Sequence, residues 1–554
     1  MELGATTDFD VTTLRGRRAD NRWDRVCIGD LVERVTWSTP DKAALIGWDG
    51  AYADGAFREL TYRGLDALIN QAANALIAAG VEPGDRILMI CENSVEAYVA
   101  KLGAARMGAA VAPVNPAMAG DMLSHVVGVL QPRLTIVDAE FVPRVAATLA
   151  GLAVGVDVTI EIGGAAADRS LGFSEFVAGQ PETEPDVRIH GDDICELLFT
   201  SGATAMPKGV MLSHTSGTLA AHGFALSLTR GLEVETHLRL VTFLPMIYHV
   251  GHLVFMLPCF ATGGTVVLGR RPDAAAAAEA VERERATALW GGSPAMMAAF
   301  STAAATGGRD ISSLTVAIYG WAALPPAVLD EMQQQAPRLT VAEIFGQTEA
   351  IACHRFWPSQ DPEIYRETAP QDNNVGRPSP LLASRIISVD DEWLEGTVGQ
   401  PGEVVYRSPV VTAGYYKDPT ATAAAFRSGW FHSGDCCAYD AGGRRIMLDR
   451  FKDIVKTGGE NVSTIRVESV LVQHPKIAKA AVIGLADDRW GEVVTAVVVP
   501  ADDTLTEDEV IAFARTRLAG YESPKRVVIV DALPETVGGK IMKYRLRQSL
   551  GEQQ

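Results

Sequence analysis

Residues 198–214 read LFTSGATAMPKGVMLSH, an apolar run followed by small and hydroxyl-bearing residues and a single lysine. The apolar start predicts a strand that delivers a loop, and small residues let backbone N–H groups approach anionic oxygens. Thr200, Ser201 and Thr204 can donate hydroxyl hydrogen bonds, and a positive charge is added at Lys208. Such a loop suits a polyphosphate, although an ordinary polar turn with a solvated lysine explains this stretch equally well on its own.

This stretch lacks the G-x-x-x-x-G-K-[ST] spacing of a Walker loop, because Gly209 follows the lysine instead of preceding it. It resembles the phosphate loop of the adenylate-forming superfamily, which contains acyl-CoA synthetases, luciferases and peptide-synthetase adenylation domains. That loop reads roughly T-S-G-T-T-G-x-P-K-G-V, so Ala203 and Ala205 stand where a hydroxyl residue and a glycine are usual. The resemblance implies an ATP phosphate site made of Thr200, Ser201, Gly202, Thr204 and Lys208.

The composition is that of a globular enzyme with more than one domain. A length of 554 residues predicts at least two domains, and 47% apolar with 21% charged residues is ordinary for such an enzyme. The net charge of −19 disfavours a nucleic-acid partner. The acidic start and the lack of an apolar run of about 20 residues argue against a signal peptide and a transmembrane segment. Seven scattered cysteines without C-x-x-C spacing predict reduced thiols and a cytoplasmic protein.

Helix and strand patterns alternate between about residues 28 and 200, which predicts a layered α/β fold. Residues 60–76 have helical periodicity, residues 86–90 predict a buried strand, and Ser94 is placed to cap the next helix. The alanine-rich residues 274–280 predict a further helix ahead of a strand.

Residues 343–349 read EIFGQTE and resemble the superfamily's [Y/F]-G-x-T-E element. There the aromatic residue packs on adenine, the threonine meets the α-phosphate, and the glutamate holds Mg²⁺, which prefers oxygen ligands. The resemblance therefore assigns Glu349 to the metal and Thr348 to catalysis. It assigns to the nucleotide site Gly320, Glu343, Ile344, Phe345, Gly346 and Thr348.

Residues 243–251 read FLPMIYHVG and resemble a P-x-x-H-x-x-G stretch in which the aromatic residue helps to gate the acyl pocket. At Trp321 the superfamily usually has a small residue, so a tryptophan there would fill volume. We infer a pocket that is short, or flat and suited to a planar acid; Trp321 turned into the core is the alternative. The acid pocket is assigned Tyr248, His249, Trp321, Gly346, Gln347 and Ile351.

Three later stretches extend the resemblance to residue 543. GWFHSGD, residues 429–435, and DRFKDIVKTGGENV, residues 449–462, imply that Asp435 and Arg450 hold the ribose. The same resemblance makes Lys452 the hinge and places a thiol tunnel along Lys456, Gly458 and Gly459. LPETVGGKIMK, residues 533–543, implies a catalytic lysine at Lys540, which would act with Lys208 and Thr348 to stabilise charge at phosphorus.

The resemblance implies a large multi-subdomain amino-terminal domain, residues 1–450, with layered sheets and helices that hold ATP and the acid. A small mobile α+β domain, residues 451–554, would carry the catalytic lysine. The implied reaction joins a fatty or aromatic carboxylic acid to coenzyme A through an acyl-adenylate, using ATP and Mg²⁺ and releasing pyrophosphate and AMP. Three alternatives stay open: loading of a carrier protein, activation of a non-carbon acid such as nitrite, and a non-catalytic nucleotide binder. The oligomeric state is open too, and a homodimer is one assembly that the sequence allows.

The two alanines of the phosphate loop yield a first prediction. Ala203 lacks a hydroxyl that would meet a phosphate, and Ala205 costs roughly 1 kcal/mol against glycine if its position needs φ > 0. The double substitution Ala203→Thr, Ala205→Gly should therefore lower the apparent Michaelis constant for ATP in a pyrophosphate-release assay. An unchanged constant would refute this account of the loop.

Overall fold

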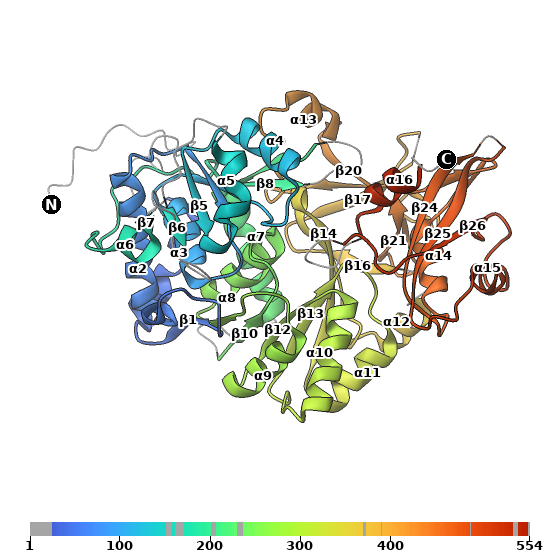
Figure 1. Cartoon of the computed structure of the whole chain (residues 1–554), viewed down its shortest axis with the longest axis horizontal. Coiled ribbons are helices and arrows are strands. Elements are labelled where there is room, and N and C mark those ends of the chain that lie inside the picture. The colour runs from blue at the N-terminus through green and yellow to red at the C-terminus, as the bar shows by residue number, and fades with distance from the viewer. Residues whose placement is uncertain are drawn as a thin grey trace.

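The computed structural model describes residues 25–150, 158–160, 171–200, 206–229, 237–368, 373–388, 390–487, 489–535 and 541–551. These residues form three β-sheets with helices packed around them (Figure 1). No helix within these ranges has the length and apolar character needed to cross a membrane.

A seven-stranded sheet has the order β7-β6-β5-β3-β4-β8-β9. Its strands are β3 (Arg86–Ile90), β4 (Ala110–Pro113), β5 (Leu134–Asp138), β6 (Val158–Ile160), β7 (Leu171–Gly172), β8 (Ile194–Thr200) and β9 (Lys208–Ser213). Neighbouring strands are parallel except β8 and β9, which form an antiparallel hairpin. The helices that accompany this part of the chain are α1 (Glu33–Ser38), α2 (Tyr62–Ala78), α3 (Val95–Arg106), α4 (Gly120–Leu130), α5 (Val142–Ala150) and α6 (Phe173–Val177). Residues of α3 pack on one face and residues of α4 and α5 on the other, as a mostly parallel sheet requires.

The largest sheet has fourteen strands, parallel from β1 to β14 apart from edge strand β2 and antiparallel from β14 onward. Its strands are β1 (Ala43–Gly47), β2 (Glu59–Thr61), β10 (Arg239–Thr242), β11 (Thr265–Leu268), β12 (Ala288–Gly292), β13 (Val316–Gly320), β14 (Thr340–Gln347), β15 (Ile351–Phe356), β16 (Asn374–Pro378), β17 (Ala383–Ile387), β18 (Gly402–Arg407), β19 (Phe426–Arg427), β20 (Trp430–Tyr439) and β21 (Arg445–Arg450).

Two helical layers cover the parallel part of this sheet. On one face lie α9 (Ala274–Glu284), α10 (Pro294–Gly307), α11 (Pro326–Gln335) and α12 (Pro362–Thr368), seen at the bottom of Figure 1. On the other lie α7 (His214–Leu228), the π-helix η5 (Val250–Met256) and α8 (Leu257–Ala261), which share one core with α2, α3 and strands of both large sheets. A short helix, α13 (Pro419–Ala425), precedes β19.

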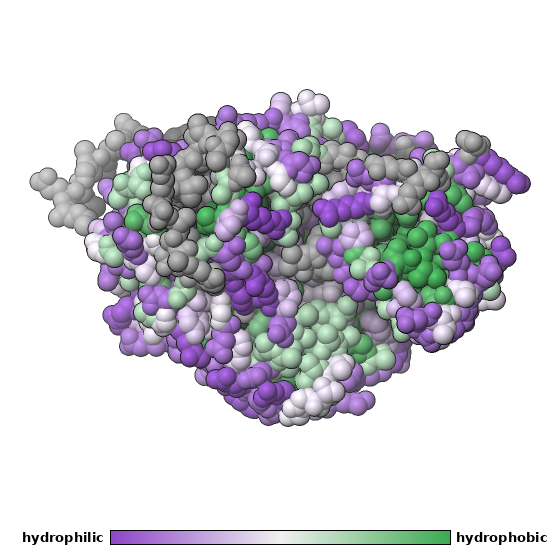
Figure 2. Space-filling model, viewed as in Figure 1, coloured by the Kyte–Doolittle hydropathy of each residue, from purple (hydrophilic) through white to green (hydrophobic). Residues whose placement is uncertain are grey.

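The last sheet belongs to the carboxy-terminal part of the chain and has two cores of its own. It contains β22 (Val455–Thr457), β23 (Glu460–Val462), β24 (Ile477–Asp487), β25 (Gly491–Pro500) and β26 (Arg526–Ile529), with helices α14 (Thr464–Leu471), α15 (Glu507–Arg515) and α16 (Lys543–Gly551). Four residues separate it from β21. Hydrophilic side chains cover most of the face drawn in Figure 2, and an apolar area lies where Figure 1 places β24 and β25.

The local sequence patterns explain these elements. The predicted helix 60–76 is observed as α2, and the predicted strand 86–90 as β3. The Ser94 hydroxyl accepts a hydrogen bond from Ala97 N and caps α3, and the alanine-rich stretch forms α9. All seven cysteines are free and buried, as expected for reduced thiols.

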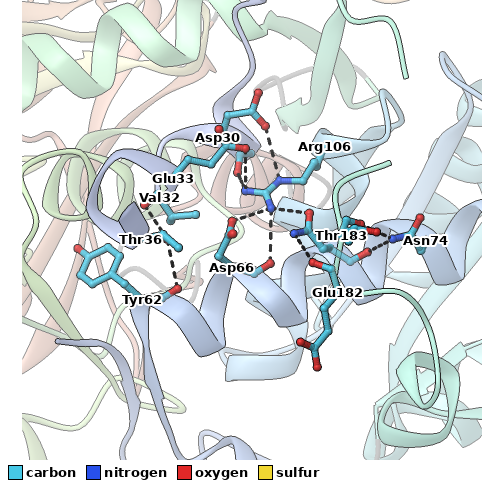
Figure 3. A network of polar contacts seen from close by, with 12 residues as sticks. Asp30, Val32, Glu33, Thr36, Tyr62, Asp66, Asn74, Arg106, Glu182 and Thr183 are labelled. Atoms are coloured by element: carbon cyan, nitrogen blue, oxygen red, sulfur yellow. Dashed lines mark hydrogen bonds and ion pairs between the residues drawn. The ribbon is translucent and has the colours of Figure 1, made fainter. Parts of the chain in front are cut away.

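A buried arginine ties the first helices together. The Arg106 side chain is fully buried and donates to Asp66 Oδ1 at 2.7 Å, Asn70 Oδ1 at 2.7 Å and Gly29 O at 2.6 Å (Figure 3). Asp30 Oδ1 lies 3.5 Å from its Nε. Burial opposes ionisation of Arg106, but the Asp66 and Asp30 carboxylates outweigh it and raise the pKa of the guanidinium. The charge is therefore paired on several sides.

This network predicts a large cost for losing one partner. Asp66→Ala should lower the free energy of unfolding by about 3–5 kcal/mol, because the buried guanidinium loses its nearest carboxylate. Asp41→Ala is the control, since Asp41 meets Arg63 at 3.3 Å on the surface and exposed pairs contribute about 0–1 kcal/mol. Thermal and urea unfolding measure both, and equal losses in the two variants would contradict this interpretation of Arg106.

Candidate active site

The stretch at 198–214 is a β-hairpin. Register pairing of β8 with β9 puts Thr200 directly opposite Lys208. Lys208 is exposed, and its Nζ lies 5.1 Å from the centre of the Tyr415 ring. The segment around Tyr415 runs beside β9, with a backbone bridge to Val210. Ser201, Gly202 and Thr204 lie outside the described residues, as do the alanines at 203 and 205.

Tyr415 also meets the glutamate assigned to the metal. Its hydroxyl donates to Glu349 Oε1 at 3.0 Å, and the Thr412 amide donates to Glu349 O at 2.6 Å. Burial first, and then the Glu349 charge, hold the pKa of Tyr415 well above its usual value, so the phenol stays a donor. In the part of the chain that the structure describes, no hydrogen bond occupies Glu349 Oε2. A half-buried carboxylate oxygen next to a cationic hairpin fits the oxygen ligation that Mg²⁺ prefers.

Thr348 and Glu349 lie in the tight connection between β14 and β15. Thr348 Oγ1 is 3.3 Å from Nδ1 of the buried His249, the residue before η5. The next strand begins at Ile351 with φ 59° and ψ −117°. A β-branched residue with positive φ is a genuine outlier, and such strain gathers at functional sites. This strained turn places Thr348 and Glu349 together at the carboxyl end of β14.

A second buried cluster lies beside them. Asp435 is 1% exposed and accepts hydrogen bonds from Gln347 Nε2 and Arg450 Nε, each at 3.1 Å. Antiparallel register on β20 and β21 places Asp435 opposite Arg450. The Asp435 charge raises the pKa of Arg450. The structure thus brings one carboxylate assigned to ribose next to both the assigned arginine and the end of β14.

Trp321 is not a core residue, so that alternative is wrong. The side chain is 41% exposed and its backbone has φ +73°. Its ring centre lies 5.6 Å from that of Trp290, which stacks on Phe255 at 4.4 Å. These three rings form an aromatic wall. Gly320 just before it must be glycine, since a Cβ there would meet Ile344 O at 2.6 Å.

The side chains of Glu343 and Ile344 are buried in two different cores, so the nucleotide contacts assigned to these residues would come from their backbone. Successive residues of β14 point to opposite faces of a sheet that is covered on both sides. Ile344 packs into the core shared with α7, and the 2% exposed Glu343 lies in the other core. The resemblance carried the whole motif over as a block, whereas strand alternation removes these two side chains from the site.

Glu343 lies in a chain of buried oxygens. Tyr319 Oη is 2.9 Å from Glu343 Oε2 and 2.9 Å from Tyr365 Oη, and Tyr365 donates to Leu324 O. Each phenol can donate only one hydrogen bond. If Glu343 is neutral, its own proton serves the contact with Tyr319, and the two phenol protons serve the contacts with Tyr365 and Leu324 O. Burial raises the pKa of Glu343 to about 8, which favours this neutral form.

The other assigned residues occupy separate places. Gly346 is exposed and Phe345 stacks on His354 with ring centres 5.9 Å apart. The half-buried Tyr248 directly precedes His249, and burial raises the pKa of its phenol. Lys452 is exposed in the turn between β21 and β22. Lys540 lies outside the described residues.

The thiol-tunnel residues form the β22–β23 hairpin, with φ +60° at Gly458 and +89° at Gly459. Two residues that sequence reasoning missed hold it in place. Gly458 N donates to Trp490 O at 2.8 Å, and Lys456 N donates to Glu492 Oε2 at 2.7 Å. Neither carries a local signal, because both lie more than 30 residues downstream in the chain. Tyr415 belongs to the stretch YYKDPT, residues 415–420, which resembles the superfamily, but that stretch does not reveal its contact with Glu349.

A family model described as AMP-binding enzyme matches residues 32–416, and one described as AMP-binding enzyme C-terminal domain matches residues 466–540. The chain belongs to the AMP-binding enzyme family.

Relatives of this AMP-binding enzyme span almost its whole length. A feruloyl-CoA synthase of Amycolatopsis sp. is 34% identical over 89% of this chain and 94% of its own. A long-chain-fatty-acid–CoA ligase of Mycobacterium tuberculosis is 30% identical over 93% of this chain and 98% of its own. Among solved structures, ATP-bound MatB from Rhodopseudomonas palustris is 27% identical with a TM-score of 0.80, covering 95% of this chain and 99% of that one.

The protonated Glu343 predicts an unusual pH dependence. A folded-state pKa of about 8 lies above the ordinary value of about 4.3, so the stability from this group is complete at low pH. It is lost as pH rises from about 4.3 through 8. Glu343→Gln mimics the neutral acid and should gain stability relative to the wild type from pH 6 to pH 8.5.

Urea unfolding at pH 6, 7 and 8.5 measures this difference. Glu363→Gln serves as the matched control, because Glu363 is an exposed carboxylate on α12, the helix that carries Tyr365. A constant difference between Glu343→Gln and the wild type across these pH values would show that Glu343 is ionised in the folded state.

Proposed function

We propose that this AMP-binding enzyme is an ATP-dependent acid:CoA ligase that forms an acyl-adenylate and then an acyl-CoA thioester. The observation that carries the proposal is the meeting of Lys208, Glu349 and Tyr415 beside the β8–β9 hairpin. Relatives named as CoA ligases over most of both chain lengths support it. We propose the cytoplasm as its compartment, because seven free buried thiols suit a reducing environment.

The nucleotide would lie along the end of β14. Asp435 and Arg450 would hold the ribose, since an ionised carboxylate accepts from both hydroxyls. Phe345 would pack on adenine beside the backbone of Gly346, and the β8–β9 hairpin would hold the phosphates. Glu349, whose Oε1 is fixed by Tyr415, would hold Mg²⁺, and the ion would neutralise phosphate charge.

In the first half-reaction an oxygen of the substrate carboxylate forms a bond to the α-phosphorus, and the bond to pyrophosphate breaks. Lys208, Thr348 and Lys540 would donate to the oxygens on which charge builds. The strained turn at Ile351 fixes the position of Thr348, and His249 lies 3.3 Å from its hydroxyl. This arrangement holds a donor in position before the substrate binds.

In the second half-reaction a thiol, most simply that of coenzyme A, attacks the carbonyl carbon and AMP leaves. We place the domain boundary between residues 450 and 451 and the hinge at Lys452. Rotation there would exchange Lys540 for the β22–β23 hairpin of Lys456, Gly458 and Gly459 at the same cleft. Trp490 O and the Glu492 carboxylate accept hydrogen bonds from the backbone of that hairpin and would keep its shape during the movement.

The acid would lie against the aromatic wall of Trp321, Trp290 and Phe255, with Tyr248, His249, Gln347 and Ile351 around it. Trp321 is the exposed ring of this wall, with Trp290 and Phe255 buried behind it, and a flat aromatic surface favours a planar substrate. The relative named feruloyl-CoA synthase supports an aromatic acid as the substrate. The relative named long-chain-fatty-acid–CoA ligase supports an aliphatic acid as the alternative.

Pyrophosphate release from Mg-ATP tests the proposal, measured across short, long-chain and aromatic acids and nitrite, each with and without coenzyme A. We expect one class of carboxylic acid to drive release and to become a thioester when coenzyme A is added. Lys540→Ala should slow release by at least about a hundredfold, since one oxyanion donor contributes about 2.7–4 kcal/mol.

Other outcomes would identify a different enzyme of the same fold. Release with an acid but no thioester, together with acylation of a phosphopantetheinylated carrier, would make a carrier protein the acceptor. A response only to nitrite would remove the carboxylic acid from the proposal. No release with any substrate would leave a nucleotide binder without this activity. Size-exclusion chromatography of the same preparation tests the homodimer.

A further inference from the structure

Arg355 is a half-buried arginine without a counter-ion. It lies on β15, and its guanidinium carbon is 5.4 Å from the centre of the Phe224 ring on α7. Within the described parts of the chain, no carboxylate or carbonyl oxygen bonds to it. Its pKa is lowered to about 10, and burial is the sole cause. By contrast, buried Arg106 has acidic partners on several sides.

The neighbouring arginine does not share this situation. Arg377 of β16 pairs with Arg355 in the sheet register. Its Nη2 donates to Gly442 O at 2.9 Å, and its side chain is exposed. Two like charges opposite one another on a sheet are unfavourable unless something offsets them. Arg377 is offset by a carbonyl and by water, so the unmatched charge is that of Arg355.

The position of Arg355 points to the acid pocket. Ile344 and Gly346 share one face of β14, and their register partners on β15 are Arg355 and Ala352. Arg355 therefore extends from the same side of the sheet as Ala352. That side is the one covered by α7 and η5. A small apolar cavity lies there between Gly223 and Phe224 of α7 and Ile351 and Ala352 of β15. A Cβ on Gly223 would touch nothing, which leaves the space open.

A cation that is partly shielded from water and has no partner in the protein is costly, and proteins commonly offset such a charge with an anion or an acceptor oxygen. Perturbed, unpaired charges beside clefts are for this reason candidates for ligand contact. The apolar cavity is lined by Ile351, which is assigned to the acid pocket, and by Phe224, whose ring the Arg355 guanidinium covers. A substrate that occupied it would present its far end to the guanidinium.

We propose that Arg355 is a specificity residue that binds an acceptor oxygen at the end of the acid remote from the reacting carboxylate. The substrate class is therefore an acid with a second oxygen group, a carboxylate or a phenolic or keto oxygen, at its far end. This inference rests on the proposed acid:CoA ligase function. A guanidinium donates in a planar fork, so a carboxylate that accepts two hydrogen bonds would bind best.

Matched acids that differ only at the far end test the proposal. The cinnamic series is 4-carboxycinnamate, 4-hydroxycinnamate and 4-methylcinnamate, and the linear series is adipate and heptanoate. Each is assayed for pyrophosphate release with the wild type, Arg355→Met, Arg355→Lys and the control Arg377→Met. Binding is followed independently as the shift that each acid causes in the thermal unfolding midpoint.

In at least one series the wild type should have a lower Michaelis constant for the oxygen-bearing acid than for its apolar match, by about tenfold or more. The reason is that hydrogen bonds to charged groups contribute about 1.5–3 kcal/mol. Arg355→Met should abolish this preference. Its kcat and its Michaelis constant for the apolar acid should stay within about twofold of the wild-type values. Arg355→Lys should keep part of it, and Arg377→Met should keep all of it. Without any acid, Arg355→Met should unfold at the same temperature as the wild type or a higher one.

Equal preference for oxygen-bearing and apolar acids in both series would overturn the inference while leaving the ligase function intact. A rise in the Michaelis constants of all acids together in Arg355→Met would also overturn it, because that is a structural effect. If no acid releases pyrophosphate, the proposed function fails. The thermal shifts then test the inference on their own. 4-Carboxycinnamate or adipate must raise the unfolding midpoint of the wild type and not that of Arg355→Met, and the absence of that difference would overturn the inference.

Discussion

The carboxylate of Asp435 is the interaction on which the site depends most. It is 1% exposed and is shared by Gln347 at the end of β14 and Arg450 at the end of β21. A buried charge is stable only when such partners surround it. It therefore joins the parallel part of the largest sheet to its antiparallel part, and to the last strand before the small carboxy-terminal sheet.

Next to this carboxylate the backbone accepts strain. Ile351 and Trp321 both have positive φ, and both lie just after strands of the central sheet, β14 and β13. Their conformations set the two sides of the assigned pocket, one at the Thr348–Glu349 turn and one at the aromatic wall. Strain of this kind costs on the order of 1–3 kcal/mol for each residue and persists only where surrounding structure holds it. The cores on both faces of the sheet supply that support.

Charge is distributed differently around Arg106 and Arg355. Arg106 has several acidic neighbours and holds together α2, α3 and the turn at Ile28–Asp30, which is a structural role. Arg355 has an aromatic ring and a cavity beside it and no acidic neighbour among the described residues. Arg106 thus has a structural role, whereas Arg355 is a candidate ligand contact. The two arginines differ in the groups that surround them.

The sequence by itself determined the element types and the motifs, because these depend on periodicity, capping and residue chemistry within a few positions. It predicted α2, β3 and the Ser94 cap. Its motifs also carried the resemblance from which the family was first inferred. Only the tertiary structure decided which motif side chains face the site. Glu343 and Ile344 share the motif of Thr348 and Glu349, yet strand alternation between two covered faces turns them into the cores. The roles inferred for Trp490 and Arg355 depend on contacts between distant parts of the chain, which no local pattern records.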